Sequence, residues 1–176
     1  YPNTEEDGTK SVMIIGLSAL GKEKLFGGAS TMSIPEVDVD GNVVDAFGMI
    51  FSNLKDSKNL RSITDWGNVR YIFSDAFSET KIERIPESWK HVEFIGPKAF
   101  FQTLIEELPD DWSGVDRVGG YAFANCYNLF RLPEGVGAVR LFSQFVFSKC
   151  NITRVPMFLA DHNVPKTLLY GNPLLL

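Results

Sequence analysis

Hydrophobic positions in the second half of the chain recur about every 23 residues, a period much longer than that of a single helix or strand. Each copy centres on an Ala-Phe pair or its Val-Phe variant: Ala76-Phe77, Ala99-Phe100, Ala122-Phe123 and Val146-Phe147. The phenylalanines are separated by 23, 23 and 24 residues. A period of this size predicts stacked repeats and disfavours a closed globular domain.

Other positions keep the same register as the phenylalanine. An aliphatic residue followed by proline comes eight or nine residues later: Ile85-Pro86, Leu108-Pro109, Leu132-Pro133 and Val155-Pro156. A valine comes eight residues earlier, at Val69, Val92, Val115 and Val139. Eleven residues earlier stand Trp66, Trp89, Trp112 and Val136. A weaker fifth copy lies upstream around Phe51.

These columns describe a coil that cannot bury enough apolar surface alone, so we expect the coils to stack around one shared core. The inward residues of short parallel strands are predicted to be Ile82 and Ile85, Ile105 and Leu108, Leu129 and Leu132, and Ile152 and Val155. Proline ends each strand because it has no N–H to donate. The Ala-Phe pairs are expected on the opposite, convex side, where the structural core is formed by Phe77, Phe100, Phe123 and Phe147. Gly96 and Gly119 precede the convex turn, where we expect a tight or positive-φ backbone.

At Ile95 to Phe100 and Val118 to Leu129 the chain resembles the leucine-rich repeats of the BspA type, whose unit reads roughly I-G-x-x-A-F-x-x-C-x-x-L. The resemblance covers about residues 43–156. It implies a leucine-rich-repeat solenoid, a right-handed coil with short parallel strands on one face and tight turns or 3-10 segments on the convex face. The tryptophan column is not part of the usual pattern, and the strand at Ile82 to Pro86 lacks one aliphatic step.

The two ends depart from the repeat. We expect an N-terminal capping region at 1–42, about five coils at 43–156 and a C-terminal cap at 157–176. Within the first region, Val12 to Ile15 reads as a strand and Leu17 to Phe26 as a short helix. A separate small domain cut short is the alternative at the N-terminus, and a lead into further sequence is the alternative at the C-terminus.

Composition changes this picture little. Of 176 residues, 44% are apolar and 22% charged, as in an ordinary folded domain. The net charge of −5 disfavours a nucleic-acid or anionic-membrane partner. No apolar stretch approaches the roughly 20 residues that membrane insertion requires. The polar start at Tyr1 is no signal peptide, but it is compatible with a trimmed terminus, so export stays open.

Residues with catalytic or metal-binding chemistry are sparse. His91 and His162 are not at metal-ligand spacing, and Ser18 lacks the second glycine of a nucleophile elbow. The run Asp38 to Asp45 alternates oxygen-bearing residues but misplaces the glycine of a calcium loop, so a hairpin turn explains it more simply. We therefore predict no catalytic residues, no cofactor and no metal site.

Cys126 and Cys150 share one column of the repeat, where they form either a disulfide or two buried thiols. They therefore do not determine whether the protein lies in an oxidising or a reducing cellular compartment.

The strand face is the predicted binding surface. Its candidate residues are Arg84, Glu107, Phe130, Arg131 and Arg154. The mixed charges are expected to pair between neighbouring coils, Arg84 with Glu107 and Glu107 with Arg131. Phe130 is either a binding anchor or packed against Tyr127 or the next coil. An aromatic edge of Trp66, Trp89 and Trp112 for sugars or peptides is a second candidate, with core packing as its alternative.

The predicted function is a non-catalytic protein-interaction module. The resemblance to BspA-type repeats implies a microbial protein, secreted or displayed at the cell surface, that binds host or matrix proteins. One alternative is a structural segment of a larger cell-envelope protein, and another is a carbohydrate-binding module that uses the tryptophan column. The identity of the partner and the oligomeric state do not follow from the sequence.

Overall fold

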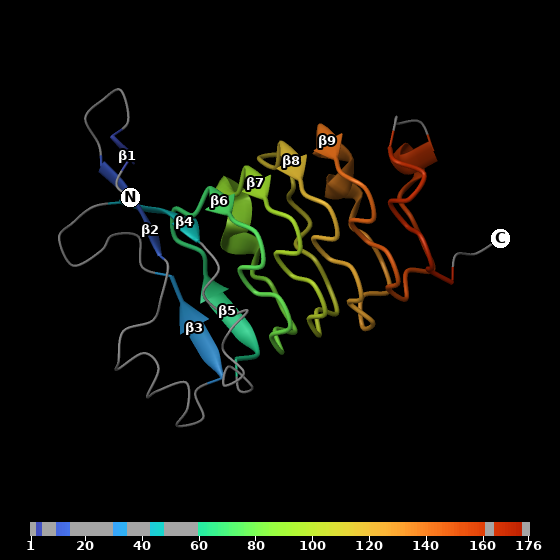
Figure 1. Ribbon diagram of the computed structural model, residues 1–176, viewed down its shortest axis with the longest axis horizontal. Coiled ribbons are helices and arrows are strands. Elements are labelled where there is room, and N and C mark those ends of the chain that lie inside the picture. The colour runs from blue at the N-terminus through green and yellow to red at the C-terminus, as the bar shows by residue number, and fades with distance from the viewer. Residues whose placement is uncertain are drawn as a thin grey trace.

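The chain forms a stack of coils in the computed structural model, which describes residues 3–4, 10–14, 30–34, 43–47, 60–160 and 164–173 (Figure 1). One sheet of seven strands has the order β1-β2-β4-β6-β7-β8-β9, and a second sheet pairs β3 with β5. All pairs are parallel except β1 with β2. Neighbouring strands in the order β6 to β9 come from consecutive coils, so the described part has the repeat fold with parallel strands that the sequence predicts.

The strands are short. Their bounds are Asn3–Thr4 (β1), Lys10–Ile14 (β2), Thr31–Ser33 (β3), Val43–Phe47 (β4), Ser62–Asp65 (β5), Tyr71–Ile72 (β6), Phe94–Ile95 (β7), Arg117–Val118 (β8) and Leu141–Phe142 (β9). Three 3-10 helices span Glu87–His91 (η2), Glu134–Ala138 (η3) and Met157–Ala160 (η4). Each follows an aliphatic-proline step, so the 3-10 segments do not lie at the Ala-Phe pairs, where hydrogen-bonded turns occur instead.

The position of the main parallel ladder differs from the prediction. Strands were expected at segments such as Ile82 to Ile85, but these segments make only isolated bridges, Ser62 with Arg84, Arg84 with Glu107 and Arg131 with Arg154. The continuous ladder runs through β6 to β9, which lie about five residues before each core phenylalanine. The expected segments are short and end in proline, which cannot extend the pairing.

All side chains predicted to point inward are buried except Val155 in the last coil. Ile85, Leu108 and Leu132 are exposed by only 7%, 6% and 6%, because the following coil covers them. Val155 occupies the same column but is 43% exposed, so its predicted burial was wrong. Residues 164–173 add a further turn beside Phe147, but no segment equivalent to Val155 follows in the described part of the chain, and the outer side of Val155 therefore stays open.

The phenylalanine column forms the centre of the core. Phe77, Phe100, Phe123 and Phe147 are fully buried. Their rings stack coil on coil, with centroid separations of 5.3, 5.1 and 5.4 Å and interplanar angles of 11°, 6° and 17°. Ring stacking thus adds to the free energy of burial at each coil boundary.

The turn around each phenylalanine has an unusual backbone. The residues two before and two after the phenylalanine have positive φ in the four turns around Phe77, Phe100, Phe123 and Phe147: Asp75, Glu79, Lys98, Gln102, Tyr121, Asn125, Phe145 and Lys149. Alternate N–H groups of one turn donate to carbonyls of the next turn, for example Phe77 to Ala99 at 2.7 Å and Phe100 to Ala122 at 2.8 Å. The sequence carries no signal for this geometry, because glycine and asparagine are its usual markers and only Asn125 matches.

Of the two alternatives predicted for Gly96 and Gly119, a tight backbone or a positive φ, the structure has the tight one. Neither has a positive φ. A Cβ on Gly96 would lie 2.6 Å from the carbonyl carbon of Phe73, and one on Gly119 would overlap the backbone of Pro97. The adjacent coil therefore approaches the glycine backbone too closely for any side chain.

The two cysteines are free, buried thiols and not a disulfide. The Cys126 thiol donates to the Phe100 carbonyl at 3.2 Å, and the Cys150 thiol to the Phe123 carbonyl at 3.2 Å. In the same column, Thr80 and Thr103 donate to Phe77 and Phe100. The column therefore selects a small side chain that hydrogen-bonds to a carbonyl. Burial raises the pKa of Cys126 to about 11 and also raises the pKa of Cys150.

The C-terminal segment 164–173 continues the stack, although the sequence pattern was expected to end near Pro156. The N–H groups of Phe147 and Lys149 donate to the carbonyls of Leu168 and Tyr170 at 3.0 and 2.7 Å. Asn172 takes the place of the threonine and cysteine column, where its Nδ2 donates to the Phe147 carbonyl at 2.7 Å. The boundaries proposed for the three regions, 1–42, 43–156 and 157–176, stay predictions.

We predict that Gly119→Ala lowers the free energy of unfolding by about 1–3 kcal/mol, because the added methyl group overlaps the preceding coil. Thermal melting should fall by several degrees. Gly120→Ala is the matched control, since its Cβ would make ordinary contacts with the Gln144 carbonyl oxygen at 3.4 Å and the Ser143 Cβ at 3.9 Å. Equal melting temperatures for the two variants would show that the coils do not approach at Gly119 as described.

We also predict that Cys126 and Cys150 resist iodoacetamide at pH 8 in the folded protein and react fully in denaturant. The thiolate is the reactive form, and burial keeps both thiols protonated at this pH. Mass spectrometry of the alkylated protein counts the modified sites. Because threonine already occupies this column, Cys126→Thr should fold normally, and rapid modification of the remaining cysteine in the native state would contradict its burial.

Candidate functional site

The predicted binding residues lie together on one face of the coils. Arg84, Glu107, Phe130, Arg131 and Arg154 are all exposed. The bridges of Arg84 with Glu107 and of Arg131 with Arg154 place these residues on adjacent rungs. The strand face, defined by these five residues, is therefore a continuous outer surface held by a hydrogen-bonded backbone.

Charges on this face pair differently from the prediction. Arg131 does bind Glu107, with its Nη2 3.2 Å from Oε1, as expected. Arg84 does not pair with Glu107, and neither Arg84 nor Arg154 has an ion-pair partner in the described part of the chain. One coil earlier, Arg61 binds Glu83 at 2.6 Å. These pairs are exposed, so each contributes only about 0–1 kcal/mol.

Phe130 is 47% exposed, and the neighbouring Tyr127 is 57% exposed. No ring contact joins Phe130 to Tyr127 or to any other aromatic side chain that the structure describes. The alternative in which Phe130 stacks on Tyr127 is therefore not what the structure has. Tyr127 was missed as a surface residue because its column holds Lys81, Leu104 and Asn151 in the other coils and has no common chemistry.

The tryptophan column does not form an exposed edge. Trp66, Trp89 and Trp112 are exposed by 0%, 1% and 0%. Trp89 and Trp112 pack edge to face with centroids 4.7 Å apart, and their Nε1 groups donate to the carbonyls of Asp111 and Pro109. The Nε1 of Trp66 is buried without a hydrogen-bond partner. Because all three rings are buried, they present no surface to sugars or peptides, so the aromatic edge was wrong and its core alternative holds.

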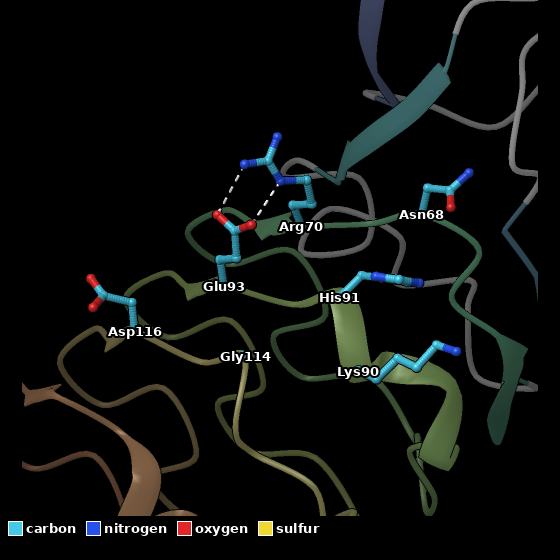
Figure 2. Close-up of a pocket in the computed structure, with 7 residues that line it drawn as sticks. All are labelled: Asn68, Arg70, Lys90, His91, Glu93, Gly114 and Asp116. Carbon is cyan, nitrogen blue, oxygen red and sulfur yellow. Dashed lines mark hydrogen bonds and ion pairs between the residues drawn. The ribbon is translucent and has the colours of Figure 1, made fainter.

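A polar hollow of about 460 Å³ lies beside the ladder of β6 and β7 (Figure 2). Its lining includes Arg70, Lys90, His91, Glu93 and Asp116. The Arg70 guanidinium binds Glu93 through two hydrogen bonds of 2.9 and 3.2 Å, while Lys90 and His91 extend from η2 away from this pair. The sequence did not point to this hollow, because its residues come from columns that differ in charge between coils.

The acidic groups of this hollow are already neutralised. Glu93 is bound by Arg70, and Asp116 is bound by Arg140, which places its Nε 2.7 Å from Oδ1. The Lys90 ammonium is exposed and has no ion-pair partner among the described residues, and the His91 imidazole is also exposed. The arrangement therefore offers polar contacts to a partner surface, without a nucleophile beside a base.

A second, apolar hollow of about 490 Å³ lies at the C-terminal end of the stack. Its lining includes Val155, Met157, Leu159, Leu168 and Leu169. Met157 is 86% exposed, in a column that holds Glu87, Asp110 and Glu134 in earlier coils. The interior of the last described coil is thus open at this end.

The turn side carries a further set of exposed rings. Tyr121 stacks on Phe145 with centroids 5.0 Å apart, and Phe145 meets Tyr170 edge to face at 5.9 Å. The sequence showed no common pattern here, since the column of Tyr121 and Phe145 holds Asp75 and Lys98 in the other coils. The stacked faces cover one another, so mainly ring edges are presented to solvent.

Most of the other residues considered for catalysis or metal binding lie outside the described part of the chain. Ser18, His162 and most of the Asp38 to Asp45 run lie outside the described residues. Across 60–160 and the shorter described ranges, no cluster of three His, Cys, Asp or Glu side chains is placed to hold a metal ion. No helix of the described ranges has the length and apolar character to cross a bilayer.

The sequence matches one family of known proteins. Six copies of the BspA type leucine rich repeat region match residues 22–106 and 93–166, a span wider than the 43–156 recognised from the sequence. Among solved structures, a leucine-rich repeat protein from Bacteroides ovatus is similar, with a TM-score of 0.43 and 18% sequence identity. That alignment covers 100% of this chain and 51% of the other, so this chain spans about half of the longer protein. No curated protein matches in sequence. The chain belongs to the BspA type leucine-rich repeat family.

Proposed function

We propose that this chain is a non-catalytic protein-interaction module that binds its partner through the strand face. Repeats of this family are generally protein-interaction modules, and they are generally non-catalytic. The observation that carries the choice of surface is Phe130, a large aromatic side chain that is 47% exposed between charged residues. Exposed aromatic and arginine side chains supply most of the binding energy at protein interfaces.

The rigidity of the strand face supports this choice. The Thr153 N–H donates to the Phe130 carbonyl at 3.1 Å, and the Asn151 N–H donates to the Leu129 carbonyl at 3.0 Å. Leu129 and Ile152, between the outward residues, are fully buried. A partner therefore meets outward side chains on an ordered backbone and loses little conformational entropy of this chain on binding.

The biological role that we propose is that of a microbial adhesin-like protein, secreted or displayed at the cell surface, which binds host or matrix proteins. BspA-type repeats are typically surface-associated, which supports this location.

A structural segment of a larger cell-envelope protein is the second candidate. The open apolar hollow at Val155 and Met157 favours it, because another coil or domain packed there would cover exposed apolar surface. The carbohydrate-binding alternative required exposed tryptophan rings, and it is not supported because the tryptophans are buried.

We predict that Phe130→Ala combined with Arg131→Glu and Arg154→Glu weakens partner binding at least about tenfold, a loss near 1.4 kcal/mol. The exposed positions should leave the melting temperature almost unchanged. Surface plasmon resonance on a panel of purified matrix proteins, including collagen, laminin and fibronectin, measures the affinity.

A matched variant on the turn side combines Tyr170→Ala with Lys98→Glu and Lys149→Glu. It makes the same chemical changes at exposed positions far from the strand face and should bind as the natural chain does. If the strand-face variant keeps full affinity while the turn-side variant loses it, the binding surface has been assigned to the wrong side. If the natural chain binds no member of the panel, the matrix-binding role is contradicted.

A further inference from the structure

Charge is segregated along the stack. Residues 60–116 contain six lysines and arginines against eleven aspartates and glutamates, a net charge of −5. Residues 117–173 contain six basic residues against two acidic ones, a net charge of +4. The total of −5 for the whole chain conceals this contrast. The last coils therefore present a positive surface beside strongly negative neighbours.

The strand face shows the same contrast at the level of single residues. Arg84, Arg131 and Arg154 occupy one outward column. Arg84 forms a β-bridge with the acidic Glu107, whereas Arg131 and Arg154 form a β-bridge with each other. Like charges on facing rungs destabilise a sheet. Arg131 shares Glu107 at 3.2 Å, and Arg154 lacks any ion-pair partner within residues 60–160 and 164–173. Arg131 and Arg154 are therefore exposed like charges on bridged residues, and no ion pair of Arg154 in these ranges offsets their repulsion.

A carboxylate placed between these two arginines attracts both guanidinium groups and so offsets the repulsion between them. Each guanidinium can donate two hydrogen bonds to a carboxylate, and such charge-assisted bonds are about twice as strong as neutral ones. Exposed apolar residues adjoin the pair along the chain: Phe130 precedes Arg131, Val155 follows Arg154, and Tyr127 lies four residues before Arg131, with exposures of 47%, 43% and 57%. The local chemistry therefore combines anion recognition with an aromatic contact.

We propose that the partner presents a short acidic segment with one large apolar side chain to this end of the strand face, an inference that rests on the proposed function. Its carboxylates lie between Arg131 and Arg154, and its apolar side chain packs on Phe130 and Tyr127. A short segment fits better than a nucleic acid or an anionic membrane, because the adjoining coils carry −5 and repel an extended polyanion.

The probe is a fluorescein-labelled nonapeptide of aspartate and glutamate with a central phenylalanine, titrated with the full chain and followed by anisotropy. Two counterparts replace the phenylalanine with serine or all acidic residues with lysine. The acidic phenylalanine peptide should bind, the serine counterpart should bind about tenfold more weakly, and the lysine counterpart should not bind. Affinity should fall with added salt, because the pairing is between exposed charges.

Arg131→Gln with Arg154→Gln should weaken binding of the acidic peptide about tenfold. Arg61→Gln with Arg84→Gln is the matched control, since it removes two arginines from the same face in the negative coils and should change affinity less than about twofold. Equal effects of the two double variants, no binding of the acidic peptide, or tighter binding of the lysine peptide would each overturn the proposal.

Duplex DNA, heparin and vesicles containing phosphatidylserine serve as competing polyanions. If any of them binds more tightly than the acidic peptide, the site is a general polyanion surface and the proposal is wrong. Competition against a bound matrix protein separates this inference from the proposed function. Suppose that the strand-face triple variant no longer binds that protein but the acidic peptide does not compete with it. The strand face is then still the binding surface, and the proposed acidic segment of the partner is wrong.

Discussion

The hydrogen bonds between successive Ala-Phe turns are the constraint on which the rest of the structure depends. Alternate N–H groups of one turn donate to alternate carbonyls of the next, as Asp75, Phe77 and Glu79 do to Pro97, Ala99 and Phe101. These bonds fix the distance between coils, and at that distance the core phenylalanines stack with centroids 5.1 to 5.4 Å apart. The ladder and the ring stack therefore have matching spacings, and each stabilises the other.

The positive φ values of the turn follow from this constraint. Directing alternate N–H groups toward one neighbour requires residues such as Lys98 and Gln102 to adopt a left-handed backbone, which costs roughly 1–2 kcal/mol for a residue with a Cβ. A buried N–H without a partner costs a similar amount, about 1–3 kcal/mol, so the strained conformation is retained at every coil. Since the backbone is set by the hydrogen bonds, the side chains of this column are free to be aspartate, lysine, tyrosine or phenylalanine.

The contrast between buried columns that must repeat and turn positions that accept any side chain explains which features the sequence could predict. Burial of Phe77, Phe100, Phe123 and Phe147 followed from their period alone, because a ladder of like residues requires the same volume in every coil. The left-handed turn positions could not be predicted, since no residue type marks them. The sequence could not choose between a tight backbone and a positive φ at Gly119, because both select glycine and only the contact with the neighbouring coil distinguishes them.

The surface was predicted less well for a related physical reason. The strand-face residues were located correctly as outward, because they alternate with buried leucines and isoleucines, but the partners of their charges were not. An exposed ion pair contributes only about 0–1 kcal/mol to the free energy of folding. Small differences in side-chain geometry therefore decide whether Arg131 or Arg84 binds Glu107. Sequence spacing places both arginines equally near that carboxylate and cannot choose between them.

A stack of coils separates the requirements of folding from those of binding. Inside, each column must repeat, since every coil packs on two neighbours of the same shape. Outside, a residue contacts few neighbours, so charge can accumulate along the stack at little cost to the core. The change from −5 over residues 60–116 to +4 over 117–173 lies in these outer positions, while the buried columns stay closed to solvent across the boundary even where Trp112 is followed by Val136 and Thr103 by Cys126. Core packing therefore does not require the segregation of charge, whose physical effect is an electrostatic field that differs between the two parts of the stack.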